Sequence, residues 1–131
     1  MSEKFTIEII SPERTILKSD AHEVTIPSYE GQMGILKDHI PIISFLKPGI
    51  IKVITGSEEH SFYVEDGIVE FKDNSLSILT SSIFNIKDAD KRFISDSITQ
   101  AENELNKENL DDQKRFLLNH KVEVLKSISI N

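Results

Sequence analysis

Apolar and polar residues alternate in short runs along the first two-thirds of the chain. Phe5, Ile7 and Ile9 alternate with Thr6 and Glu8, a period of two that buries one face of a strand. The same extended pattern recurs in residues 15–17, 22–26, 50–54, 60–64, 68–71 and 76–79. Turn residues separate these runs roughly every 8 to 12 positions, which predicts an all-β sandwich or barrel.

Residues 28–48 depart from this alternation, because apolar residues are mixed with glycine, proline and charged residues. Pro27 is expected to end the preceding strand, since proline has no N–H to donate to a sheet. Gly31 and Gly34 are too close for a dinucleotide-binding motif and are typical of a tight turn. We interpret the segment as a loop, either a long crossover connection buried on the sheet or a surface for a partner protein.

The pattern changes in the last third of the chain. All glycines and prolines lie at or before Gly67. Ile94, Ile98, Ala101 and Leu105 then follow at spacings of four, three and four, the period of an amphipathic helix. Residues 75–82 are predicted as the last strand. The boundary near residue 86 gives a β module of residues 1–86 and a helical module of residues 87–131.

A second helix is predicted after a break at residues 106–110. Leu118, Val122 and Leu125 repeat the helical spacing, Asn109 is the expected N-cap, and Lys126 suits the last turn. Two helices of about 17 residues are each about 25 Å long. Because such short helices depend on packing, we expect the hairpin to lean on the β module or on another protein.

Composition excludes several functional classes. Of the 131 residues, 15 are Lys or Arg and 22 are Asp or Glu, a net charge of −7 that disfavours nucleic-acid binding. The absence of cysteine excludes disulfides, cysteine-ligated zinc and thiol catalysis. The longest apolar run, residues 40–46, is far shorter than a membrane helix. The N-terminus has no signal-peptide pattern, so we expect a cytosolic protein or its organellar equivalent.

No group of residues in the sequence is typical of an active site. The four histidines, His22, His39, His60 and His120, show no metal-binding spacing and are expected to be ordinary surface or edge residues. Asp38 and His39 are adjacent, but no serine in a nucleophile elbow accompanies them. We therefore expect neither an enzyme nor a metalloprotein.

One long motif carries a resemblance to a known family. Residues 26–41 read IPSYEGQMGILKDHIP and residues 46–50 read LKPGI. This pattern resembles the EGxxG[IV]LPxHxP loop and [LI]KPG turn of the epsilon subunits of F-type ATP synthases. Residues 62–71 and 76–79 are similar to the hairpin and strand that follow in that family. Two positions depart from it, because Lys37 replaces a proline and Asp66 replaces the first of two glycines.

The resemblance implies a fold and a role for the whole chain. The fold is an N-terminal ten-stranded β-sandwich, the rotor-docking domain, followed by a C-terminal antiparallel two-helix hairpin, the regulatory domain. The role is that of a non-catalytic central-stalk subunit of a proton-translocating ATP synthase. Its partners are the gamma subunit, the ring of c subunits and the alpha/beta catalytic head, and its location is peripheral, on the cytoplasmic face of a bacterial inner membrane.

The same resemblance assigns residues to these roles. The loop that faces the c-ring in the family corresponds to Glu30, Gln32, Met33 and His39. The hairpin, which restrains ATP hydrolysis in the family by extending into the catalytic head, presents an apolar stripe. This stripe comprises Ile94, Ile98, Leu105, Leu118 and Val122.

Only some members of this family bind ATP, and they do so through an I-D-x-x-R-A motif at the start of the first helix. Asp90 is the best match to the aspartate of that motif, but Phe93 stands in place of the arginine and Arg92 is one position away. We therefore expect no cofactor and no regulatory ATP binding, with Asp90 and Arg92 as the nearest nucleotide candidates.

The alternative function is a stand-alone β-sandwich module that binds a small ligand or a carbohydrate. Such a module needs an exposed aromatic platform, and the chain has no tryptophan and only two tyrosines.

Overall fold

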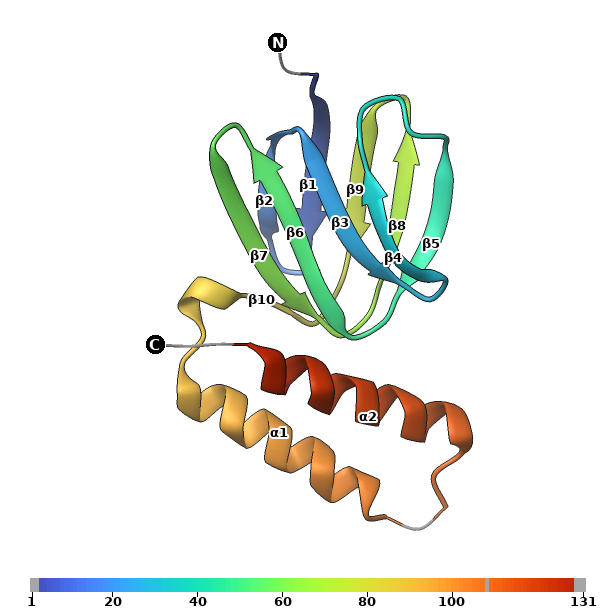
Figure 1. Cartoon of the computed structure of the whole chain (residues 1–131), viewed down its shortest axis with the longest axis vertical. Helices are drawn as coiled ribbons and strands as arrows, with labels where there is room; N and C mark the ends of the chain where they lie inside the picture. Colours follow the sequence, from blue (N-terminus) through green and yellow to red (C-terminus); the bar gives the residue numbers. More distant parts are fainter. Residues whose placement is uncertain (1–2, 108, 129–131) are drawn as a thin grey trace. The chain divides into compact units, whose positions relative to one another are not determined.

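The chain divides into two units at Asn85. The computed structural model describes residues 3–107 and 109–128, with only strands before Asn85 and helices after it (Figure 1). The predicted fold class, a ten-stranded β-sandwich followed by an antiparallel two-helix hairpin, is confirmed. Among the described residues, no helix is both long enough and apolar enough to cross a membrane.

The first unit is built from ten short strands. They are β1 (Phe5–Ile10), β2 (Thr15–Ala21), β3 (Glu23–Ser28), β4 (Gly31–Ile35), β5 (Ile42–Leu46), β6 (Gly49–Thr55), β7 (Glu58–Val64), β8 (Gly67–Lys72), β9 (Ser75–Leu79) and β10 (Ile83–Asn85). Their order in the sheet is β10-β7-β6-β3-β5-β8-β9-β1-β2, and β4 pairs with β3 outside this path.

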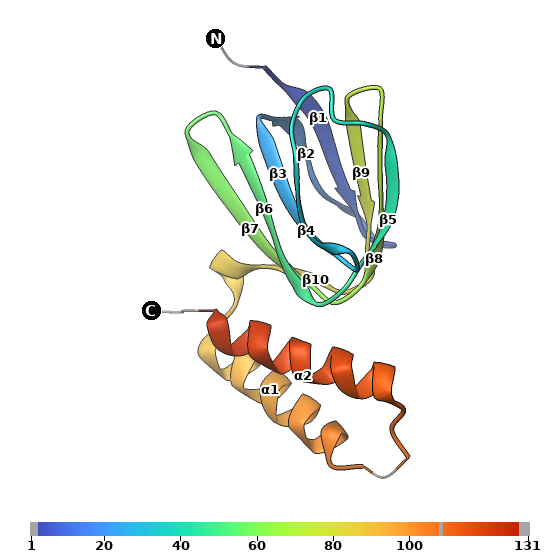
Figure 2. The same cartoon turned by 45° about the vertical axis from the view of Figure 1, so that its right-hand side comes forward.

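The sheet curls on itself to enclose a core. All the neighbouring pairs are antiparallel except β1 and β9, which lie parallel, with Ile7 opposite Leu76. Figures 1 and 2 show β1, β2 and β9 lying across from β3, β6 and β7. The parallel pair joins the first strand of the domain to one of its last, and so links β1 and β2 to the rest of the sheet.

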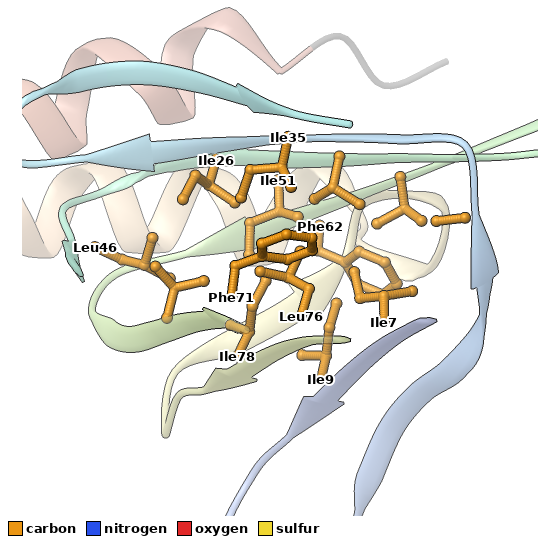
Figure 3. Close-up of a cluster of buried hydrophobic side chains, with 14 of the residues drawn as sticks. Ile7, Ile9, Ile26, Ile35, Leu46, Ile51, Phe62, Phe71, Leu76 and Ile78 are labelled. Atoms are coloured by element: carbon orange, nitrogen blue, oxygen red, sulfur yellow. The ribbon is translucent and has the colours of Figure 1, made fainter. Parts of the chain in front are cut away.

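The core consists of the inward side chains of the alternating strands. Phe5, Ile7 and Ile9 of β1 are buried as the sequence predicts. The Phe5 and Phe71 rings meet edge to face with centroids 5.6 Å apart. Figure 3 shows the side chains of Ile7, Ile9, Ile26, Ile35, Leu46, Ile51, Phe62, Phe71, Leu76 and Ile78 packed together. Every residue of this cluster comes from the first unit.

The interpretation of residues 28–48 as a loop is wrong, because the segment contains β4 and β5. Ser28 pairs with Gly31 across a two-residue turn, Tyr29-Glu30, and Gly31 takes a φ of 122°. Two glycines within five residues weaken the strand signal of β4, since glycine is a poor strand former. Pairing with β3 on one side compensates for this weakness, which the sequence alone does not reveal.

Pro27 does not end its strand, which continues to Ser28. Up to Thr25, β3 pairs with β6, and from Ser28 it pairs with β5. On its other side β3 pairs with β4, with Pro27 opposite Gln32. The Pro27 carbonyl accepts a hydrogen bond from the Lys47 N–H at 3.0 Å, on the side where the partner changes, so the missing N–H falls between the pairings with β6 and β5.

The last strand of the sandwich also differs from the prediction. Residues 75–82 do not form one strand, because β9 ends at Leu79 and the three-residue β10 follows. The Thr80 Oγ1 atom accepts a hydrogen bond from the Ser82 N–H at 3.2 Å, which closes a short turn between the two strands. β10 then pairs with β7 at the edge of the sheet.

The second unit contains a 3₁₀ turn, η1 (Ile86–Asp88), and the helices α1 (Lys91–Leu105) and α2 (Asp112–Ser127). Asp90 caps α1 and Asp111 caps α2, each accepting a backbone N–H at 2.7 Å. The prediction of Asn109 as the N-cap is therefore wrong. Asn109 takes a φ of 69°, whereas an N-cap needs the extended backbone that Asp111 supplies.

The apolar stripe predicted for the hairpin is only partly buried. Ile94 and Val122 are buried, whereas Ile98, Leu105 and Leu118 are half-buried. Ala101 and Leu125 complete the buried set. A Lys126–Glu102 ion pair, 3.4 Å between nitrogen and oxygen, joins the two helices, but its exposure limits its contribution to about 1 kcal/mol or less.

Candidate protein-docking site

The predicted c-ring-facing residues lie along β4 and its flanking loops. Glu30 is exposed in the β3–β4 turn, and its Oε1 atom accepts a hydrogen bond from the Ser44 hydroxyl at 2.8 Å. The Ser28 hydroxyl donates to the Gly31 carbonyl at 2.7 Å across the same turn. These two bonds from buried serines hold the turn and orient its carboxylate.

The four predicted residues do not form one cluster. Gln32 is exposed on β4 near Glu30, whereas Met33 is half-buried and packs against the core. His39 lies beyond the other end of β4, and five residues of strand span about 17 Å. Its Nδ1 atom is 2.8 Å from the Ile40 carbonyl, and its ring meets Phe71 edge to face.

Asp38 braces the β4–β5 loop instead of pairing with His39. Its N–H donates to Asn74 Oδ1 at 2.7 Å, and the Asn74 side-chain amide donates to Asp38 Oδ1 at 3.0 Å. Asp38 takes a φ of 67°, a conformation that Asp and Asn tolerate better than most residues. The loop is therefore tied to the β8–β9 turn, and the two residues form no acid–base pair.

Apolar side chains gather on the outer face of the sandwich, where the sequence analysis did not place a site. Phe45, Ile68 and Leu79 lie opposite one another on β5, β8 and β9 and are exposed at 57%, 44% and 52%. We call these three residues the apolar ladder. Leu79 also pairs with Ile10 of β1. The sequence does contain one signal of this surface, because consecutive apolar residues such as Ile68 and Val69 place apolar side chains on both faces of a strand.

A groove of about 650 Å³ at one end of the sandwich is lined in part by the apolar ladder. It is bordered by the β1–β2, β3–β4 and β7–β8 turns and by the end of β9. Its lining is largely apolar, with hydroxyl groups and one carboxylate, and comprises Ile10, Ser11, Pro12, Tyr29, Phe45, Leu46, Asp66, Gly67, Ile68, Leu79, Thr80 and Ser81. This groove and the ladder form a surface suited to another protein.

Titratable side chains are found in both units of the described residues, 3–107 and 109–128. No three His, Asp or Glu side chains among them are grouped to hold a metal ion. His60 Nε2 lies 3.7 Å from Glu58 Oε1 within one strand. Burial, and then the charge of Glu65, raise the pKa of Tyr63 well above its ordinary value of 10.0, so its phenol stays neutral at physiological pH.

Comparison with known proteins assigns the chain to a family. Residues 4–86 match the family model of the ATP synthase delta/epsilon chain β-sandwich domain. Over 130 residues, the chain is 58% identical to the ATP synthase epsilon chain of Pelagibacter ubique (strain HTCC1062), covering 98% of this chain and 100% of that one. The chain belongs to the ATP synthase epsilon chain family. The resemblance carried by the motif in residues 26–50 is thereby confirmed.

Some more distant relatives align with this epsilon-family chain across both of its units. The ATP synthase epsilon chain of Hyphomonas neptunium (strain ATCC 15444) is 30% identical over 129 residues, 98% of this chain and 96% of that one. A chain in the cryo-EM structure of the Euglena gracilis mitochondrial ATP synthase (OSCP, F1 and c-ring) has a similar fold. The TM-score is 0.73 at 20% identity, covering 94% of this chain and 78% of that one.

A second solved structure gives the same result for the fold. A chain in the central stalk and c-ring structure of the Tetrahymena thermophila mitochondrial ATP synthase superposes with a TM-score of 0.66 at 18% identity. The match covers 95% of this epsilon-family chain and 96% of that chain. At these identities the comparison concerns the fold.

Proposed function

We propose that this chain is a non-catalytic rotor subunit in the central stalk of an F-type, proton-translocating ATP synthase. It couples rotation between the c-ring and the catalytic head, and its hairpin restrains ATP hydrolysis. The observation that carries the proposal is a largely apolar groove on the sandwich, lined in part by the exposed apolar ladder. Such a surface is costly to leave in water, and a subunit covers it by docking. Because the chain belongs to the epsilon family, we propose the ATP synthase as the complex to which it docks.

The proposed partners are the gamma subunit, the c-ring and the alpha/beta head. Glu30 and Gln32 present exposed polar groups from one end of β4 and are the proposed c-ring contacts. Met33 positions this strand through the core, and His39 supports the loop at the other end of the strand. The chain is then peripheral, held at the cytoplasmic face of a bacterial inner membrane through the complex.

Recovery of the intact complex tests this proposal. A tagged copy of the full chain, expressed in its own cells and purified from mildly solubilised membranes, is expected to bring gamma, alpha and beta with it in fixed proportion. The untagged parent strain provides the control for background binding. Recovery of the chain alone, while the remaining subunits stay together as an active complex, would contradict the proposal.

The hairpin is proposed to act without nucleotide. Asp90 uses its carboxylate to cap α1 through the Phe93 N–H, while Arg92 is exposed in the first turn. The Phe93 side chain, half exposed, offers no charge to a phosphate at the position where ATP-binding relatives are expected to place arginine.

We predict that ATP at millimolar concentration does not bind the full chain or raise its melting temperature. Isothermal calorimetry and thermal denaturation measure the two effects. Phe93→Arg, a change at an exposed position, is the matched variant that restores a cation for comparison. Micromolar binding by the unmodified chain would show that other cations hold the phosphates and that the prediction is wrong.

A stand-alone ligand-binding module is the second candidate, and one observation favours it. The groove has a volume within the range of small-molecule sites, and Tyr29 and Phe45 line it. The same purification separates the two candidates, because a stand-alone module does not copurify with the ATP synthase subunits.

A further inference from the structure

The groove lined by the apolar ladder contains a single ionisable side chain apart from the Tyr29 phenol. This is Asp66, an exposed residue of the β7–β8 turn. The remaining lining consists of apolar side chains, hydroxyl groups and one glycine. A carboxylate beside apolar surface attracts a cation more strongly than one in open water, because the low-polarity walls reduce screening.

Asp66 lies in the β7–β8 turn, directly before Gly67, and aspartate is common in turns. Among the described non-glycine residues, only Asp38, Asp73, Asn74 and Asn109 have positive φ, so the Asp66 backbone is ordinary. Asp66 is also not part of the buried core. Its exposed side chain borders the groove as a surface carboxylate.

The groove is a rigid and preformed surface. A Cβ added at Gly67 would lie 2.6 Å from the Leu79 carbonyl oxygen and 3.2 Å from Leu46 Cδ1, so strand and turn are closely packed there. The Tyr29 N–H donates to the Phe45 carbonyl at 3.0 Å, which ties the β3–β4 turn to β5 on another side. A partner thus meets fixed walls and loses little affinity to rearrangement.

The chemistry of the lining favours one kind of binding partner for the groove over two others. A second copy of the chain is disfavoured, because the protein carries a net charge of −7 and the groove itself is acidic. A neutral apolar ligand would cover Asp66 without a partner, which costs free energy. A lysine or arginine next to an apolar side chain satisfies both features, and the exposed rings of Tyr29 and Phe45 also favour a cation.

We infer that this groove receives a segment of a neighbouring stalk subunit that presents an apolar side chain beside a lysine or arginine, with Asp66 binding the cation. The inference rests on the proposed function and adds the chemistry of the contact. The apolar side chain of the partner segment packs on Ile68 and Leu79. The lysine or arginine of the same segment lies beside Asp66, at the rim of the groove.

Charge variants of Asp66 test the inference in the full-length chain. The measurement is binding to the ATP synthase catalytic complex of its own organism after removal of the native epsilon chain, at low and at high NaCl. Asp66→Asn is expected to weaken binding about 10-fold and Asp66→Lys about 100-fold, mostly through slower association, because the charge lies at the rim of the contact. The unmodified chain should lose more affinity with salt than Asp66→Asn does.

The matched control is Asp20→Lys. Asp20 is an exposed residue opposite Thr6, at the other end of the β1–β2 pair from Ile10. Its replacement by lysine changes the net charge by the same amount as Asp66→Lys. It should bind as the unmodified chain does. Equal weakening by Asp20→Lys and Asp66→Lys would attribute the effect to net charge and overturn the inference.

The outcomes separate the inference from the proposed function. Failure of the unmodified chain to bind the complex refutes the proposed function, and the inference falls with it. Binding that Asp66→Asn and Asp66→Lys leave unchanged refutes the inference alone. A photo-crosslinking residue in place of Phe45 should attach to a peptide with Lys or Arg beside an apolar residue. Attachment to a segment without a cation, or to a small molecule, overturns the inference.

Discussion

Gly67→Ala is expected to destabilise the sandwich by about 3 kcal/mol or more, a large part of the stability of a domain of this size. Gly67 has a φ of +150°, which alanine rarely adopts. Its added Cβ would also lie 2.6 Å from the Leu79 carbonyl oxygen, a backbone atom that moves only if the β8–β9 pair shifts. Urea denaturation followed by far-ultraviolet circular dichroism measures the loss.

Gly56→Ala is the matched control for this prediction. Gly56 also has a positive φ, +59°, but an added Cβ meets nothing within 4 Å. The expected loss is therefore only the conformational term of about 1–2 kcal/mol. If the two variants have equal stability, the close approach of Gly67 to β9 is not what makes glycine necessary there.

Removal of the hairpin after Lys87 is expected to leave a folded sandwich that docks and supports ATP synthesis but no longer restrains ATP hydrolysis. The main core cluster contains only residues of the first unit, so the sandwich retains it. α1 and α2 have 15 and 16 residues, which at 1.5 Å per residue is about 47 Å end to end. An element of that length reaches well into a neighbouring subunit, and its loss removes the proposed brake.

The measurement uses the complex rebuilt with either the full or the truncated chain. Proton-driven synthesis and ATP hydrolysis are assayed in parallel, and circular dichroism of the free truncated chain shows whether it is folded. Loss of synthesis because the folded sandwich no longer binds would contradict the separation of docking from regulation. Equal hydrolysis with both chains would show that the hairpin is not a brake in this protein.

Much of the fold was predictable from local pattern. The alternation in β1 and the helical spacing from Ile94 to Leu105 both reflect burial of one face, and each agrees with the structure. The errors lie where local signals conflict. Two glycines obscured β4, and Pro27 suggested an end to β3 that a change of partner strand makes unnecessary.

The candidate site was less predictable, because exposure is a property of the assembled sheet. The sequence motif drew attention to Glu30 and His39, which the structure places at opposite ends of β4. The apolar ladder combines β5, β8 and β9, three strands whose neighbours are set by pairing across the sheet. No periodicity within one strand shows that its outward apolar residue meets two others.

The sequence by itself determined the class and order of the elements, because period two and period 3.6 arise from backbone geometry within a few residues. It also determined the family, through one long motif. Only the tertiary structure decided that β1 lies parallel to β9 and that Asp66 borders an apolar groove. Contacts between residues distant in the chain depend on how the strands of the whole sheet pair and curl, and the local pattern of residues does not record that arrangement.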